Sequence, residues 1–192
     1  MFDLLKTWFW WLDLAIATWV TLWVVVFCRG TPRRRWIRRL FWLGAAIGLT
    51  WEVPLFLSTT FAGSPVIVML SSPPIHPLGL IVAHALWDGG LFLAGVALIG
   101  LTCPRPILTR FRWRELGVLL LWGQLSELTV ELGGVTNEAW SYVAGFPFNP
   151  TLFHVAGHPI TLMPQLIWFA APLVFYLTAL RMDRPGDTGA TA

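Results

Sequence analysis

The sequence predicts an all-helical, multi-pass membrane protein built as a bundle of five transmembrane helices. Of the 192 residues, 56% are hydrophobic and only 12% are charged. The mean hydropathy of +0.68 lies well above that of soluble globular domains. In addition, five apolar stretches are long enough to cross a hydrocarbon core about 30 Å thick as helices.

The five expected spans fill most of the chain and comprise residues 8–28, 38–58, 78–102, 115–133 and 160–180. The first lacks a small-residue cleavage site after a short apolar core, so we expect it to be retained and not removed as a signal peptide. Because the spans use up most of the chain, residues 1–183 are expected to form one membrane domain. The tail 184–192, "RPGDTGATA", is expected to be disordered.

The arginines indicate how the spans are oriented. They crowd the connection between the first and second spans and that between the third and fourth, and Arg181 and Arg184 follow the fifth. Every basic residue except Lys6 thus falls on one side, which the positive-inside rule makes cytoplasmic. We therefore expect the N-terminus outside and the C-terminus in the cytoplasm, with no nucleic-acid partner needed to explain the arginines.

Two long connections on the expected outer side have an unusual composition. Residues 59–79 and 134–159 are apolar, aromatic and rich in proline, unlike flexible connectors. We expect them to be lids or re-entrant segments that cover an opening between the helices.

Polar side chains enter the apolar spans at similar depths. Counting about 1.5 Å per residue from the arginine-rich side places Glu52 and Glu127 about 20 Å above the cytoplasmic boundary. The same count places Asp13, Asp88 and Gln165 slightly higher, at about 25 Å. Since an ionisable group in hydrocarbon costs a few kcal/mol or more, we expect these groups to surround a polar and aromatic cavity in the outer half of the bilayer.

Helical spacing aligns several of these polar groups. Gln124, Glu127 and Glu131 recur at i, i+3 and i+7 on one helix face, and His84 lies one turn before Asp88. Four tryptophans beside these polar stripes are expected to form the cavity wall: Trp51, Trp87, Trp122 and Trp168.

Each polar residue also has a purely structural interpretation. A single buried carboxyl in a membrane helix often serves as a hydrogen-bonding group, which applies most to Glu131 and Asp13, nearest the outer headgroups. His84 alone would be a core histidine, but with Asp88 one turn away it becomes a candidate proton relay. We predict the following catalytic residues: Glu52, His84, Asp88 and Glu127. The expected substrate-binding residues are Trp51, Trp87, Trp122, Gln124, Glu131, Gln165 and Trp168.

This set of residues favours acid–base chemistry without a cofactor or a metal. The sequence contains no HExxH or CxxC pattern, glycine-rich phosphate loop or nucleophile elbow. A carboxyl shielded from water can remain protonated at neutral pH and donate to an alkene or epoxide. Tryptophan faces stabilise the resulting carbocation, and a second carboxylate can remove a proton elsewhere. These properties predict an isomerase, cyclase or hydratase.

Three stretches carry a family resemblance. "WIRRLFWLGAAIGLTWE" (36–52), "WGQ" (122–124) and "QLIWFAAP" (165–172) resemble the emopamil-binding-protein group, five-span membrane proteins that include the sterol Δ8-Δ7 isomerase. The resemblance covers roughly residues 15–180. It implies an isomerase of sterol-like or terpenoid olefins taken up from the bilayer, and it leaves a homodimer open.

The resemblance also implies individual roles. Glu52 would be a proton-handling carboxylate, Gln165 an amide near the reacting region of the substrate, and Trp168 the aromatic that faces the cation. Two positions differ from the sterol isomerases, which have a histidine four residues before the glutamate, where this chain has Gly48. Their fifth-span amide is asparagine, where this chain has Gln165.

Other functions stay open at this stage. "TWE" (50–52) is similar to membrane-bound terpene cyclases, and "WSY…GFP…GHPI" (140–160) is similar to carotenoid-modifying hydratases and cyclases. A non-catalytic sterol- or lipid-binding membrane protein is the main alternative. A small proton-coupled transporter is less favoured, because the chain has no inverted repeat and its acidic residues cluster at one depth.

Overall fold

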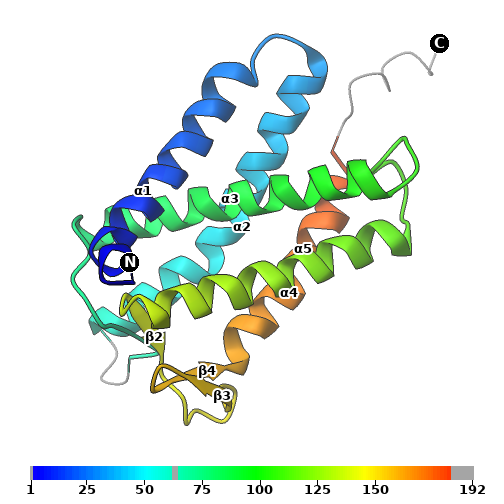
Figure 1. Ribbon diagram of the computed structural model, residues 1–192. Coiled ribbons are helices and arrows are strands. Elements are labelled where there is room, and N and C mark those ends of the chain that lie inside the picture. Colours follow the sequence, from blue (N-terminus) through cyan, green and yellow to red (C-terminus); the bar gives the residue numbers. More distant parts are fainter. Residues whose placement is uncertain (1, 62–64, 183–192) are drawn as a thin grey trace, which may run out of the picture.

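The structure of the protein, a computed structural model, describes residues 2–61 and 65–182 (Figure 1). The predicted disordered tail lies outside these residues. The described chain is mainly helical, and each of its five helices overlaps one predicted span. The helices are α1 Phe2–Phe27, α2 Pro32–Phe61, α3 Pro77–Thr102, α4 Trp113–Thr136 and α5 Leu162–Ala179.

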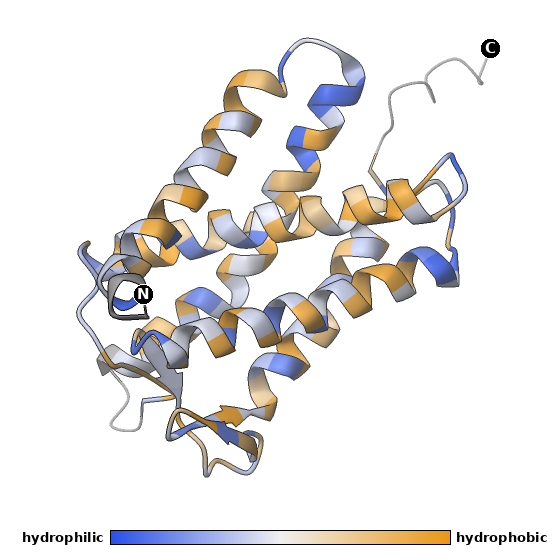
Figure 2. Cartoon of the chain, in the orientation of Figure 1, coloured by the Kyte–Doolittle hydropathy of each residue, from blue (hydrophilic) through white to orange (hydrophobic). Residues whose placement is uncertain are grey.

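Four helices, α1, α2, α3 and α5, are long and apolar enough to cross a membrane, which makes this a multi-pass membrane protein. Large apolar side chains are exposed on them, as expected for contact with lipid: Trp19 is 67% exposed and Leu101 is 82% exposed. Hydrophilic residues gather instead at the first turns of α2 and α4 (Figure 2). At 24 residues α4 is long enough to cross, but its polar residues keep it out of the apolar set, so a fifth span stays a prediction.

Proline and a capping side chain define where two helices begin. The side chain of Thr31 accepts a hydrogen bond from the Arg34 N–H, and Pro32 follows as the first residue of α2. His76 caps α3 in the same way, because its Nδ1 accepts from the Leu78 N–H. Proline suits the first helical position, where its missing N–H would have no partner.

Short strands join the two outer connections, and this corrects the all-helical prediction. β1 (Ile67–Met69) pairs antiparallel with β2 (Trp140–Tyr142), and β3 (Thr151–Val155) pairs with β4 (His158–Thr161). The strands lie at one end of the helical bundle (Figure 1). In residues 65–76 and 137–161 the structure describes paired strands and turns, and no re-entrant helix. Strands this short show too few alternations to be recognised from hydrophobic periodicity.

Close packing of α2 against α3 determines where the polar side chains meet. A Cβ atom on Gly89 of α3 would lie 2.8 Å from the backbone oxygen of Phe41, so only glycine permits this approach. Next to this contact Phe92 of α3 stacks on Phe175 of α5, with ring centroids 4.5 Å apart. The helices therefore present their inner faces to one another at short range.

A buried carboxyl fixes the connection between α3 and α4 at the arginine-rich end. Glu115 is fully buried and accepts hydrogen bonds from the Leu108 N–H (3.0 Å) and from the Tyr176 hydroxyl (3.2 Å). Arg112 lies 3.3 Å from the same carboxylate and donates to the backbone oxygens of Pro104 and Pro106. The sequence analysis did not identify this network.

Candidate functional site

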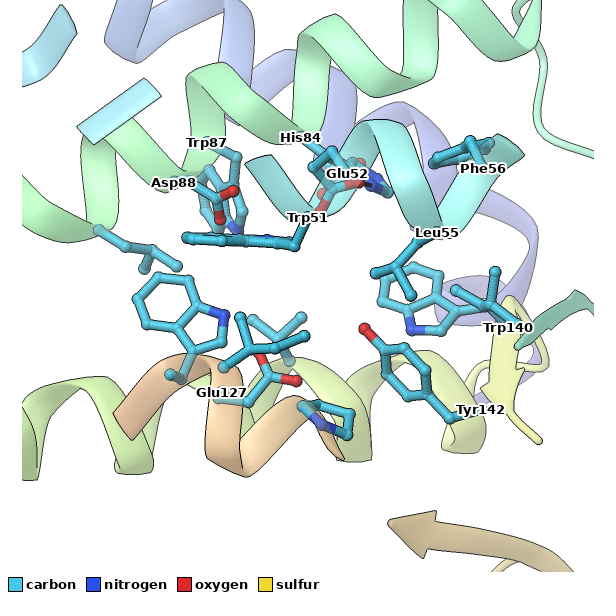
Figure 3. A pocket seen from close by; sticks show the side chains of 17 residues that line it. Trp51, Glu52, Leu55, Phe56, His84, Trp87, Asp88, Glu127, Trp140 and Tyr142 are labelled. Atoms are coloured by element: carbon cyan, nitrogen blue, oxygen red, sulfur yellow. Dashed lines mark ion pairs between the residues drawn. The ribbon is translucent and has the colours of Figure 1, made fainter. Parts of the chain in front are cut away.

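Side chains from all five helices and from β1 and β2 enclose one small pocket (Figure 3). Its volume is about 50 Å³, room for a few water molecules but well below the roughly 300–1,000 Å³ of pockets that bind drug-sized ligands. A cavity large enough for a whole sterol-like substrate is therefore not shown by the described residues. The polar residues that line the pocket are Asp13, Glu52, His84, Asp88, Glu127 and Tyr142, and its tryptophans are Trp51, Trp87, Trp140 and Trp168.

His84 lies between two carboxyl groups that come from two other helices. Its Nε2 is 3.3 Å from Asp13 Oδ2 of α1, and its Nδ1 is 3.4 Å from Glu52 Oε2 of α2. The sequence analysis paired His84 with Asp88 because the two are one turn apart. The structure instead places Asp13 and Glu52 within ion-pair distance of His84, although His84 Nε2 and Asp13 Oδ2 form no hydrogen bond in the described chain.

Asp88 occupies space that Gly48 leaves open. The Asp88 side chain is buried, and its Oδ2 has no hydrogen-bond partner in the described chain. A Cβ atom on Gly48 would collide with this oxygen and would lie 2.9 Å from Asp88 Cβ. A larger residue at position 48 therefore cannot coexist with Asp88 in its present position.

Glu127 faces the pocket from α4, across from Glu52 and Asp88 (Figure 3). Only 4% of its surface is exposed. The pocket thus receives carboxyl groups from two opposite sides, and a molecule between them would have an acid on one face and a second carboxyl on the other.

Aromatic rings form much of the remaining wall. Trp168 of α5 is buried, stacks on Phe92 at 5.4 Å between centroids and lies 5.7 Å from the ring of Trp51. The Tyr142 hydroxyl points into the pocket from β2 (Figure 3). Burial, together with the negative charges of nearby Glu127 and Glu52, holds the pKa of Tyr142 well above its usual value. Tyr142 therefore stays neutral and can donate a hydrogen bond.

Among the polar and tryptophan side chains that line the pocket, the sequence analysis did not name Trp140 and Tyr142. It placed Asp13 at the depth of the cavity but left open a purely structural role, because Asp13 lies near the outer headgroups. Trp140 and Tyr142 belong to a strand that was not predicted. The "WSY" motif was the one available signal, since aromatic residues are unusual in a flexible connector.

Two expected site residues on α4 instead bind backbone oxygens of neighbouring helices. Trp122 Nε1 donates to the backbone oxygen of Leu91 at 2.8 Å, and Gln124 Nε2 donates to that of Gln165 at 2.9 Å. Neither residue lines the pocket that the described chain forms. Their polar atoms join α4 to α3 and to α5.

Glu131 and Gln165, also expected at the site, pair with each other away from the pocket. Glu131 is fully buried, and its Oε1 accepts from the Thr161 N–H at 2.9 Å. Its Oε2 accepts from Gln165 Nε2 at 3.3 Å. The three polar residues on this face of α4 therefore have different surroundings. Glu127 faces the pocket, whereas Gln124 and Glu131 form hydrogen bonds with Gln165 of α5.

No group of three His, Cys, Asp or Glu side chains within residues 2–61 and 65–182 is arranged to hold a metal ion.

Comparison with known proteins found no matching family model, curated protein or solved structure. The resemblance to the emopamil-binding-protein group therefore stays a prediction, and the functional argument depends on the chemistry of the pocket.

Proposed function

We propose that this protein is a membrane enzyme that rearranges an isoprenoid or sterol-like olefin by protonating it, without a cofactor. The observation that carries the proposal is the meeting of four carboxyl groups and one imidazole in a tryptophan-walled pocket. The carboxyl groups belong to Asp13, Glu52, Asp88 and Glu127. The resemblance of Glu52 and Trp168 to residues of the emopamil-binding-protein group supports the same class of reaction.

The charge balance of the pocket supports a mixture of protonated and ionised carboxyls. Four carboxylates would carry four negative charges, and His84 can compensate only one of them. Uncompensated charge costs several kcal/mol per ion where water is excluded, so protons are shared among these groups. A protonated carboxyl and a carboxylate in one pocket provide the general acid and the general base that an isomerisation needs.

In the proposed reaction Glu52 transfers its proton to one carbon of the double bond, leaving a carbocation on the other. The indole faces of Trp51 and Trp168 stabilise this cation. Glu127 or Asp88 then removes a proton from a carbon next to the cation, which forms a double bond in a new position. Glu52 regains a proton from His84, and His84 regains one from Asp13. Asp13 then takes a proton from water while Glu127 or Asp88 releases its extra proton to water, so that the enzyme returns to its starting state and the substrate has exchanged one proton.

The size of the pocket indicates that only the reacting end of the substrate lies in it. An apolar groove of about 630 Å³ runs between α2 and α5 and shares Trp51, Leu55 and Ile167 with the pocket. Its other walls include Pro54 and Val174. We place the apolar part of the substrate in this groove. The side chains shared by both spaces must then move to admit the double bond.

The proposal includes an orientation in the membrane. With α4 as the fifth span, the arginines at residues 29–39 and 105–114 lie on one side and the strands on the other. The positive-inside rule places the arginine-rich side in the cytoplasm and the pocket nearer the outer surface. The N-terminus then lies outside.

Incubation of membranes from expressing cells in D₂O buffer tests the reaction whichever olefin is the substrate. Mass spectrometry of extracted lipids should reveal an olefinic lipid that gains deuterium when the wild-type protein is present. Glu52→Gln should reduce this incorporation by about 100-fold or more, because glutamine keeps the size of the side chain but has no acidic proton. The matched control is Glu115→Gln, a buried carboxyl at the other end of the molecule, which should leave incorporation per folded protein unchanged.

Two results would change the proposal. If Glu52→Gln keeps full turnover, the proton donor is Asp88 or Glu127. If the purified protein binds olefinic lipids but no lipid in the membranes gains deuterium, a lipid-binding function replaces the enzymatic one. The apolar groove between α2 and α5 is the observation that favours this second function, because lipid binding in the groove does not require the carboxyl groups of the pocket.

A further inference from the structure

A second large groove lies at the arginine-rich end of the molecule. It has a volume of about 870 Å³ and lies between α1, α2, α3 and the connection that follows α3. The turn between α1 and α2 and the connection between α3 and α4 lie at two separate corners of the molecule (Figure 1). Residues from both corners line this groove, and it shares none with the pocket.

The walls of the groove are apolar. Leu93, Val96, Ala97 and Leu101 of α3 form one side, and Ile37 of α2 lies opposite. Trp23 and Trp36 also line it, and tryptophan is enriched where a membrane meets water. A surface of this kind on a membrane protein fits a hydrocarbon chain.

The groove also carries positive charge. Arg33, in the first turn of α2, and Arg105, in the connection after α3, line it from two different elements. Within residues 2–61 and 65–182, neither forms an ion pair with an acidic side chain. The N-terminal end of α2 adds the partial positive charge of a helix start.

We propose that this groove binds an anionic phospholipid, with its phosphate between Arg33 and Arg105 and an acyl chain along Val96, Ala97 and Leu101. Basic pockets between transmembrane helices on the cytoplasmic side are suited to anionic headgroups. A second copy of the chain fits poorly, because it would bring its own arginine-rich end against this one. The site is independent of the proposed reaction.

Binding of dioleoyl phosphatidylglycerol to the purified full chain in detergent tests the proposal, with dioleoyl phosphatidylcholine as the zwitterionic control. Native mass spectrometry should show preferential adducts of phosphatidylglycerol. Replacing both arginines, Arg33→Gln with Arg105→Gln, should weaken its binding about 30-fold, because each arginine near an anionic headgroup contributes roughly one kcal/mol. Arg35→Gln with Arg110→Gln removes the same charge outside the groove and should weaken binding no more than about twofold.

The apolar part of the site has its own variant. Ala97→Phe places a ring in the groove without changing the charge, and it should weaken the binding of both lipids. Equal binding of the two lipids by the wild-type protein would overturn the proposal, as would an equal loss in the two arginine pairs. Displacement of the lipid by glycerol 3-phosphate at the same concentration would show a simple phosphate site. A dimer in place of lipid adducts would assign the groove to a second copy.

Discussion

Replacing Glu131 tests whether this carboxyl stabilises the fold, in contrast to the carboxyl groups that line the pocket. Its two oxygens join α4 to the start of α5, where Thr161 is the N-cap residue. Glu131 thus satisfies the N–H of the N-cap residue itself, while Asn149 Oδ1 accepts from the Met163 N–H at 2.7 Å in place of the Thr161 side chain. If this description is right, the residue acts through stability and not through chemistry.

The structure sets the expected loss for Glu131→Leu. Leucine has a similar volume but no acceptor, so the buried Thr161 N–H would lose its partner and so would the half-buried Gln165 amide. A buried unsatisfied group costs about 1–3 kcal/mol, and we expect a total of about 2–4 kcal/mol for the pair. For a domain of this size that free energy lowers the thermal midpoint by about 5–15 °C.

Glu131→Gln should reduce the free energy of unfolding much less than Glu131→Leu. Its remaining oxygen can accept from Thr161, and the Gln165 side chain can rotate to offer its own oxygen to the new amide. The expected cost is below about 1 kcal/mol. A thiol-reactive dye can measure the midpoint in detergent, because Cys28 and Cys103 are free and buried and become reactive on unfolding. Burial also raises the pKa of the Cys28 thiol, which keeps it unreactive in the folded protein.

Comparing the midpoints of Glu131→Leu and Glu131→Gln tests whether the hydrogen bonds of Glu131 stabilise the fold. An unchanged midpoint for Glu131→Leu would show that this link does not stabilise the fold. An equal loss in leucine and glutamine variants would show that the negative charge itself matters, and the hydrogen-bond argument would be refuted.

Three further predictions use the same protein. Gly48→Ala should reduce the free energy of unfolding by about 1–3 kcal/mol through overpacking against Asp88, seen as a lower dye-detected midpoint. Gly117→Ala, whose Cβ meets nothing within 4 Å, should be neutral or stabilising; equal effects would contradict the close approach of α2 and α3. Trp168→Phe should slow deuterium incorporation about tenfold, far less than Glu52→Gln, because a smaller ring still offers a face to the cation; a loss as large as that of Glu52→Gln would give Trp168 another role. In intact cells an impermeant thiol reagent should label Pro73→Cys but not Arg34→Cys, and the opposite pattern would invert the orientation.

The helices were predictable because one physical property fixes each of them. A segment that crosses hydrocarbon must satisfy its own backbone hydrogen bonds, so length and hydropathy locate it. The structure begins α3 at Pro77, directly after the capping residue His76 and one residue before the predicted span. The pairing of β1 with β2 was not readable, because it joins three-residue segments more than seventy positions apart and each is too short to show a period.

The level of a residue along the helical bundle was predictable, but the direction of its side chain around the helix axis was not. Counting residues along the spans placed Asp13, Glu52, Asp88 and Glu127 at similar heights, and the structure brings all four to one pocket. The same count placed Gln165 there, yet its side chain turns to Glu131. A helical stripe at i, i+3 and i+7 covers an arc wide enough to contact two neighbours, so spacing alone cannot assign each residue to one of them.

The difference at Gly48 has a physical explanation that bears on the proposed chemistry. In the sterol isomerases, whose resemblance to this chain stays a prediction, a histidine precedes the glutamate by one helical turn, whereas here Gly48 gives that space to Asp88 of α3. An imidazole still reaches Glu52, because His84 of α3 lies 3.4 Å from its carboxylate. Proton transfer depends on the distance between donor and acceptor and not on the helix that supplies them. A histidine missing from α2 is therefore no argument against proton chemistry at Glu52, as long as His84 holds its position between Glu52 and Asp13.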